Sequence, residues 1–128
     1  MERGPSWTFP RSNVVVRNHT VLAALTNKQS HKDGTLSDEE IRFLVRRAEG
    51  GFGIVTTAAS HVMVNGQGWP GEMGVWGDHQ IPGLTRLAEE LRNQGALSLV
   101  QIFHGGMRAP ADLIGSTPIS ASINHEPK

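Results

Sequence analysis

Apolar residues recur at helical spacing in residues 37–49. They fall at i, i+3, i+4 and i+7, and this stripe consists of Ile41, Leu44, Val45 and Ala48. The spacing predicts a helix with one buried face. Ser37 and Glu40 match the Ser-x-x-Glu capping box at its start, and Gly50-Gly51 ends it. The same spacing predicts a second helix over residues 81–93, with Pro82 in its first turn.

Three apolar runs without clean alternation predict strands over residues 20–25, 52–59 and 96–103. Such runs are typical of parallel strands that are covered on both faces. Residues 13–16 are predicted to form a hairpin arm that pairs across a tight turn at Arg17-Asn18. Strands that alternate with helices of this length indicate βαβ units, so the expected fold class is α/β with a parallel sheet.

The predicted elements suffice for only part of a barrel or an open α/β fold. Three parallel strands with two crossovers would leave both sheet edges open. We therefore interpret residues 1–128 as a single partial domain, with residues 1–8 disordered and residues 105–128 rich in loops.

Charge and composition exclude several classes of protein. Twelve Lys and Arg balance twelve Asp and Glu, and this argues against nucleic acid as a partner, because neutralising phosphates needs a positive field. The chain has no Cys, which excludes a disulfide scaffold and a thiolate metal site. No apolar run is long enough to span a membrane, and no signal peptide is evident. The expected location is the cytoplasm.

Two sequence motifs invite a functional interpretation that their context does not favour. Residues 66–71 match Gly-x-Gly-x-x-Gly, but Pro70 removes an amide and no helix begins for about ten residues. The segment is therefore more typical of a turn-rich loop than of a dinucleotide site. The histidines have no metal-ligand spacing, so no metal is expected. Paired carboxylates such as Asp38-Glu39-Glu40 are interpreted as solvated charges on helices.

Polar groups at the ends of the predicted strands are stronger candidates. Gln101 lies inside an apolar strand, where its amide must find a partner, either a planar heterocycle or the backbone of a neighbouring loop. Thr26 and Ala59 also end strands and would face the same mouth, which favours a ligand. His104 follows the last strand, where it either contacts a ligand or is satisfied by the backbone.

Five collinear motifs resemble the old yellow enzyme family of FMN-dependent NAD(P)H:flavin oxidoreductases and ene-reductases. The match runs in order from about Phe9 to Ile123. Its motifs lie at residues 18–26, 33–53, 66–81, 100–106 and 116–122. The resemblance implies the N-terminal portion of a (β/α)8 TIM barrel, with about three βα units and a preceding hairpin.

The resemblance also implies a cofactor site. Ala24, Leu25 and Thr26 would lie along the flavin ring of FMN, with Thr26 near O4 and N5. Ala59 would lie beside the ring, and Gln101 would bond to its pyrimidine edge.

Phe103 and His104 would belong to the substrate pocket, and the substrate would be an electron-poor alkene reduced with NAD(P)H. The residues that polarise the substrate and hold the FMN phosphate lie on later strands of the family, so no catalytic residue is expected in this chain. The alternative is a non-catalytic half-barrel that self-associates or needs a complementary chain.

Overall fold

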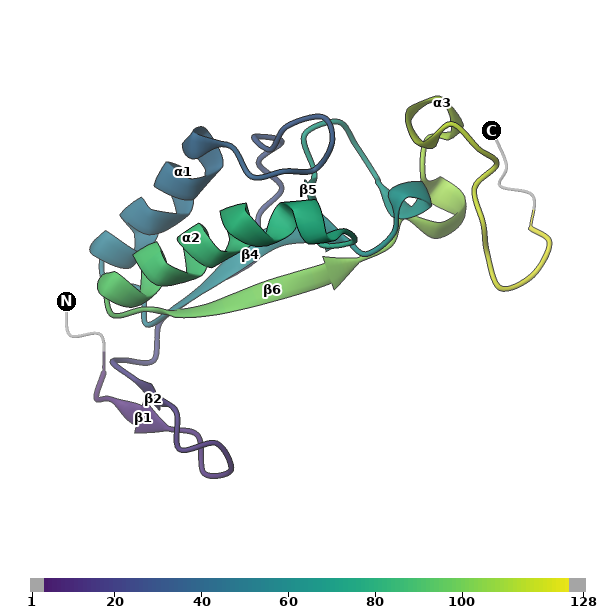
Figure 1. Ribbon diagram of the computed structural model, residues 1–128. Coiled ribbons are helices and arrows are strands. Elements are labelled where there is room, and N and C mark those ends of the chain that lie inside the picture. Colours follow the sequence, from purple (N-terminus) through teal and green to yellow (C-terminus); the bar gives the residue numbers. More distant parts are fainter. Residues whose placement is uncertain (1–3, 125–128) are drawn as a thin grey trace.

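A parallel sheet with helices on one face forms the body of the molecule in this computed structural model, which describes residues 4–124 (Figure 1). The central strand is β4 (Ile54–His61). It pairs in parallel with β3 (Val21–Leu22) at its start and with β6 (Leu97–Phe103) along most of its length. At its end it pairs with β5 (Met73–Gly74), a strand that the sequence did not predict.

Two helices cover one face of this sheet, and both agree with the predicted helices. They are α1 (Asp38–Glu49) and α2 (Ile81–Asn93), which lie side by side above β4 and β6 in Figure 1. Their apolar stripes bury the start of β4 and form the core. The core consists of Ile41, Leu44, Val45, Ala48, Val55, Leu87, Leu91 and Ala96.

The cap of α1 is only half of the predicted capping box. The Ser37 hydroxyl accepts a hydrogen bond from the Glu40 backbone N–H at 3.1 Å. The Glu40 carboxylate does not return to Ser37, because it accepts hydrogen bonds from the side chains of Asn27 and Ser30. Glu40 is fully buried, so interpreting it as a solvated charge was wrong. It ties the loop after β3 to the first turn of α1.

The N-terminal hairpin is built from different arms than predicted. Strand β2 (Val15–Val16) pairs antiparallel with β1 (Trp7–Thr8), not across a turn at Arg17-Asn18. Trp7 and Thr8 therefore form a strand where disorder was expected, whereas residues 1–3 lie outside the described residues. Arg17 instead donates hydrogen bonds to backbone carbonyls at the ends of both helices, including Ala48 and Gln94.

Short helical turns fill the loops that follow the strands. The 3-10 helices are η1 (Val64–Gly66), η2 (Asp78–Gln80) and η3 (Gly106–Arg108). A short helix, α3 (Ala111–Ile114), follows β6, and the chain beyond it has no further helix or strand up to residue 124. Residues 125–128 of the predicted loop-rich segment lie outside the described residues. No helix among residues 4–124 combines the length and hydrophobicity that crossing a membrane requires.

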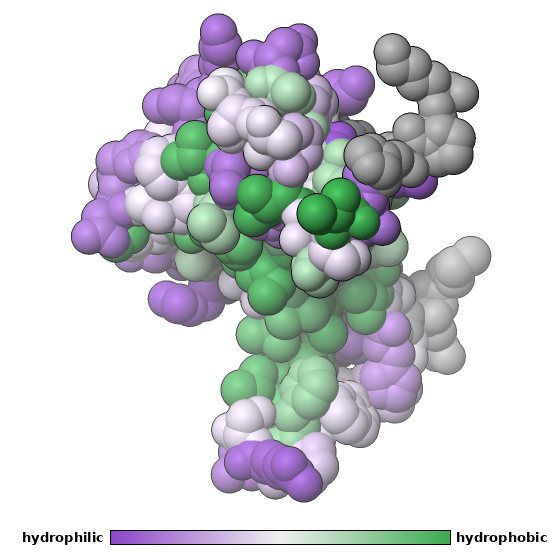
Figure 2. Space-filling view, turned by 90° about the vertical axis from the view of Figure 1, so that its right-hand side faces the viewer, coloured by the Kyte–Doolittle hydropathy of each residue, from purple (hydrophilic) through white to green (hydrophobic). Residues whose placement is uncertain are grey.

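Both faces of β6 are open to solvent from Leu99 to Ile102. Leu99, Val100 and Ile102 are 46%, 48% and 73% exposed. Figure 2 shows a band of hydrophobic residues that runs from the middle of the molecule down to the hairpin. The prediction of an enclosed strand is therefore correct for β4 and wrong for β6. The strand predicted over residues 20–25 is also shorter than expected, because it consists of Val21–Leu22, and Val21 is exposed.

Candidate functional site

The strand register brings two of the predicted site residues together. Ala59 on β4 lies opposite Gln101 on β6, and His61 lies opposite Phe103. Between Thr56 and Ala59, β4 carries a bulge that shifts the register. The Gln101 backbone N–H donates to the Thr57 hydroxyl at 3.2 Å beside this bulge. The bulge thus aligns Ala59 with Gln101, a placement that spacing alone did not reveal.

The predicted flavin contacts differ in exposure. Ala59 is buried and Ala24 is half-buried, whereas Leu25, Thr26 and Gln101 are exposed. The expectation that an apolar strand encloses Gln101 is therefore wrong for this chain. The side chains of Thr26 and Gln101 make no hydrogen bond among residues 4–124. Thr26 was predicted to end a strand, but β3 ends at Leu22, so Thr26 lies in the loop that follows. Both polar groups remain available to a ligand.

Phe103 packs against the loop of residues 66–71. Its ring centroid lies 5.4 Å from that of Trp69. A Cβ atom at Gly68 would lie 3.0 Å from the Phe103 ring, so glycine allows this close approach. The Gly-x-Gly-x-x-Gly segment therefore forms a turn-rich loop beside Phe103, as its context indicated.

His104 is satisfied by the chain itself. Its Nδ1 accepts a hydrogen bond from the Gly106 N–H at 2.9 Å, and its Nε2 lies 3.4 Å from Asn65 Oδ1. A Cβ atom at Gly66 would clash with its ring at 2.5 Å. This arrangement matches the backbone-satisfied alternative for His104.

A buried histidine and glutamate next to this loop were missed by sequence reasoning. The His61 and Glu72 side chains are 2% and 0% exposed, and His61 Nδ1 lies 3.7 Å from Glu72 Oε2. The Trp76 indole N–H donates to His61 Nε2 at 3.1 Å, and the Gly68 N–H donates to Glu72 Oε2 at 2.6 Å. One signal was available, because Glu72 is the only charged residue between positions 62 and 77.

Burial shifts both groups toward their neutral forms. It raises the pKa of Glu72 to about 7, while hydrogen bonds from the backbone of Gly68 and Trp69 oppose the rise. Burial also lowers the pKa of His61. Because the indole N–H donates to Nε2, the neutral imidazole carries its proton on Nδ1. The pair is thus a neutral histidine beside a glutamate that titrates near neutral pH.

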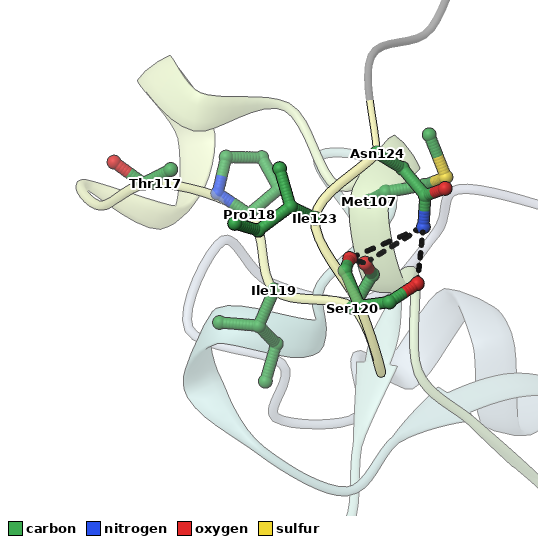
Figure 3. Close-up of a pocket in the computed structure, with 8 residues that line it drawn as sticks. Met107, Thr117, Pro118, Ile119, Ser120, Ile123 and Asn124 are labelled. Atoms are coloured by element: carbon green, nitrogen blue, oxygen red, sulfur yellow. Dashed lines mark hydrogen bonds between the residues drawn. The ribbon is translucent and has the colours of Figure 1, made fainter.

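One cavity lies away from the paired strand ends. Its volume is about 620 Å³, and it is formed by Met107 of η3 and by residues 117–124 (Figure 3). Asn124 donates hydrogen bonds to the Ser120 hydroxyl at 3.2 Å and to the Ser122 carbonyl at 3.2 Å, which closes this segment on itself. None of the predicted flavin contacts lines it. Residues 4–124 also contain no group of His, Asp and Glu side chains that could hold a metal ion.

Comparison with known proteins identifies the family. Residues 11–126 match the NADH:flavin oxidoreductase / NADH oxidase family, and the chain belongs to this family.

Relatives and solved structures agree with this assignment. The chain is 37% identical over 108 residues to the probable NADH-dependent flavin oxidoreductase YqiG of Bacillus subtilis, covering 84% of this chain and 28% of the relative. It is 34% identical to the NADH:acrylate oxidoreductase of Vibrio harveyi, over 88% of this chain and 11% of that protein. The structure of the old yellow enzyme homologue from Zymomonas mobilis superposes on the whole chain with a TM-score of 0.87, at 22% identity, and the chain covers 35% of it.

The chain matches only part of the fold of these proteins. The chain spans about a tenth to a third of the length of these proteins. Its alternating β/α units and their likeness to old yellow enzymes show a partial (β/α)8 barrel, as the resemblance implied.

Proposed function

We propose that this chain supplies flavin-facing strands of an FMN-dependent oxidoreductase, which passes hydride from NAD(P)H to an electron-poor alkene. The observation that carries this proposal is the pairing of Ala59 with Gln101 at the carboxyl ends of parallel strands, where barrel enzymes bind their ligands. Membership of the family supports a flavin. The names of two relatives, an NADH:acrylate and an NADH:fumarate oxidoreductase, support an activated alkene as acceptor.

The residues at the strand ends fit a flavin. Ala24 and Ala59 are small, so a planar ring can approach the backbone closely. The Gln101 amide offers both donors and an acceptor, as the pyrimidine edge of the ring requires, and it has no partner among the described residues. The Thr26 hydroxyl is likewise free to donate a hydrogen bond.

Each side chain has a distinct role in this proposal. FMN, when bound, supplies the hydride-transfer chemistry. Gln101 would hold the pyrimidine edge of the ring, and Thr26 would donate a hydrogen bond near O4 and N5, where a donor would tune the reduction potential. Phe103 shapes one wall of the substrate pocket. His104, whose nitrogens are engaged by Gly106 and Asn65, acts on that pocket by holding the neighbouring loop.

A second candidate is a non-catalytic half-barrel that binds a complementary chain or a second copy. The open face of β6 favours it, because Leu99, Val100 and Ile102 would be buried by further barrel units. In this case the strand ends would bind no flavin.

The test joins residues 11–126 to the remaining barrel of the Bacillus subtilis relative. We expect this chimera to purify with FMN and to oxidise NAD(P)H in the presence of cyclohexenone. The 128-residue chain alone should not turn over, because the substrate-polarising residues of the family lie on later strands. A chimera that folds, as judged by circular dichroism and gel filtration, but holds no flavin would disprove the proposal and favour the second candidate.

A further inference from the structure

Glu72 and His61 have unsatisfied polar atoms in a fully buried position. Among residues 4–124, Glu72 Oε1 and His61 Nδ1 find no hydrogen-bond partner. Leaving buried polar atoms unpaired costs free energy, and a buried charge costs more. A bound proton reduces this cost, because it removes the negative charge from the carboxylate.

We propose that Glu72 and His61 form a buried proton-binding site, in which the protonation state of Glu72 sets how firmly residues 66–71 are held against Phe103. This site needs neither bound flavin nor turnover, so its test is independent of the proposed function.

The hydrogen-bond pattern assigns the proton to Glu72. The Trp76 indole can only donate, so its bond to His61 Nε2 requires that this nitrogen stay unprotonated. Forming an imidazolium would break that bond and place a cation in a buried site. The carboxyl group meets no such obstacle, since Oε1 is free to carry a proton.

Ionisation of Glu72 acts directly on the loop. Its Oε2 accepts the Gly68 N–H at 2.6 Å, and this bond is charge-assisted only while the carboxylate is ionised. Gly68 lies against the Phe103 ring, and Trp69 contacts the same ring. Ionisation strengthens this bond, but it also leaves a buried negative charge with Oε1 unpaired. The cost of burying the charge outweighs the bond, so ionisation favours opening of the loop where Phe103 leaves β6.

Other titratable groups surround the pair. On the loop before α1 they are Lys28, His31, Lys32 and Asp33, on η2 they are Asp78 and His79, and after β6 there is His104. All except His104 are exposed. Glu40 of α1 is buried but accepts hydrogen bonds from Asn27 and Ser30. The His79 ring lies against the Trp76 ring, with 4.8 Å between their centroids, so a variant at His79 is the control for any effect assigned to Glu72.

Hydrogen–deuterium exchange of the full chain from pH 5.5 to 8.5 tests the effect on the loop. Rates are divided by those of an unfolded peptide of the same sequence. We expect protection of residues 66–71 to fall about 5- to 10-fold as the pH rises from 5.5 to about 7 and to stay level above that. Glu72→Gln should abolish this step, whereas Glu89→Gln on the exposed face of α2 and His79→Gln should retain it. A step that persists in Glu72→Gln or disappears in His79→Gln would overturn the proposal.

Infrared spectroscopy of the unmodified chain provides a test that does not depend on any variant folding. At pH 6 exposed carboxyl groups are ionised. We expect one protonated carboxyl band at this pH, disappearing with a midpoint near 7. If every carboxyl group is already ionised at pH 6, the proposal is wrong.

Discussion

Strands β4 and β6 have similar apolar sequences but opposite environments. β4 is buried along almost its whole length, because α1 and α2 cover it and β3, β5 and β6 flank it. β6 begins under α2 but is exposed from Leu99 to Ile102. The comparison shows that an apolar run predicts a strand, whereas its burial depends on which neighbours the chain supplies. It also shows why Gln101 is exposed here while Ala59, directly opposite, is buried.

The largest expected effect concerns Gln101 on the exposed strand β6. In the chimera described above, further barrel units would cover β6 and exclude water from Gln101. Gln101→Leu should then weaken FMN binding about 30- to 1000-fold, or roughly 2–4 kcal/mol, because two groups on the ring lose their partners. Thr26→Ala should cost only about 1 kcal/mol and mainly change the reduction potential.

Flavin titration of both variants measures this difference. Asn93→Leu also replaces an amide side chain with leucine, but at an exposed position at the end of α2, near the start of β6. This variant should leave FMN binding unchanged. If Gln101→Leu binds within threefold of the parent while Thr26→Ala loses FMN, the ring is not placed as proposed.

The second prediction concerns the buried end of β4. The pKa of Glu72 is raised from 4.5 to about 7, so the folded chain retains a proton that the unfolded chain releases between these values. The contribution of Glu72 to the free energy of unfolding is therefore greatest below about pH 4.5. It falls as the pH rises to about 7 and is constant above that value. The expected loss is about 3 kcal/mol.

Urea unfolding between pH 5 and 8 measures the slope. Glu72→Gln should flatten it, because the amide cannot ionise, and Glu89→Gln should leave it unchanged. Equal slopes in the parent chain and Glu72→Gln would show that Glu72 does not hold a proton in the folded state.

A matched pair of valines tests the comparison of the strands directly. Val55 on β4 is fully buried, and Val100 on β6 is 48% exposed. Val55→Ala should lower the free energy of unfolding by about 2 kcal/mol, because it removes two buried methyl groups and leaves a cavity. Val100→Ala should cost less than about 0.5 kcal/mol. Similar losses in denaturant unfolding would mean that β6 is covered in solution.

The smallest expected effect concerns association through β6. We expect the chain to self-associate, because this strand combines an open edge with an exposed apolar face. Ile102→Lys should weaken association about tenfold, or about 1.4 kcal/mol. Thr85→Lys adds the same charge at an exposed position of α2 and should change association little.

Light scattering over a dilution series reports the change. A parent chain that stays monomeric at all concentrations would contradict this prediction and would weaken the case for a half-barrel that pairs with another chain.

Local signals along the chain were enough to define α1 and α2. These signals are the Ser37 cap, the apolar stripes, Gly51 at a φ of 99° and Pro82 in the first turn. The bounds predicted from them, 37–49 and 81–93, agree with the observed helices Asp38–Glu49 and Ile81–Asn93. The alternation of helices and strands was enough to predict a parallel α/β fold, and the collinear motifs were enough to indicate the family.

The relations between distant segments arise from tertiary packing. The bulge in β4 aligns Ala59 with Gln101, Glu40 leaves its capping box for Asn27 and Ser30, and Glu72 meets His61. Each relation joins residues separated by a loop or a whole helix, so it depends on how the chain packs and not on local propensity. The same physical reason separates β4 from β6, because burial is a property of the surroundings that a strand acquires and not of its own sequence.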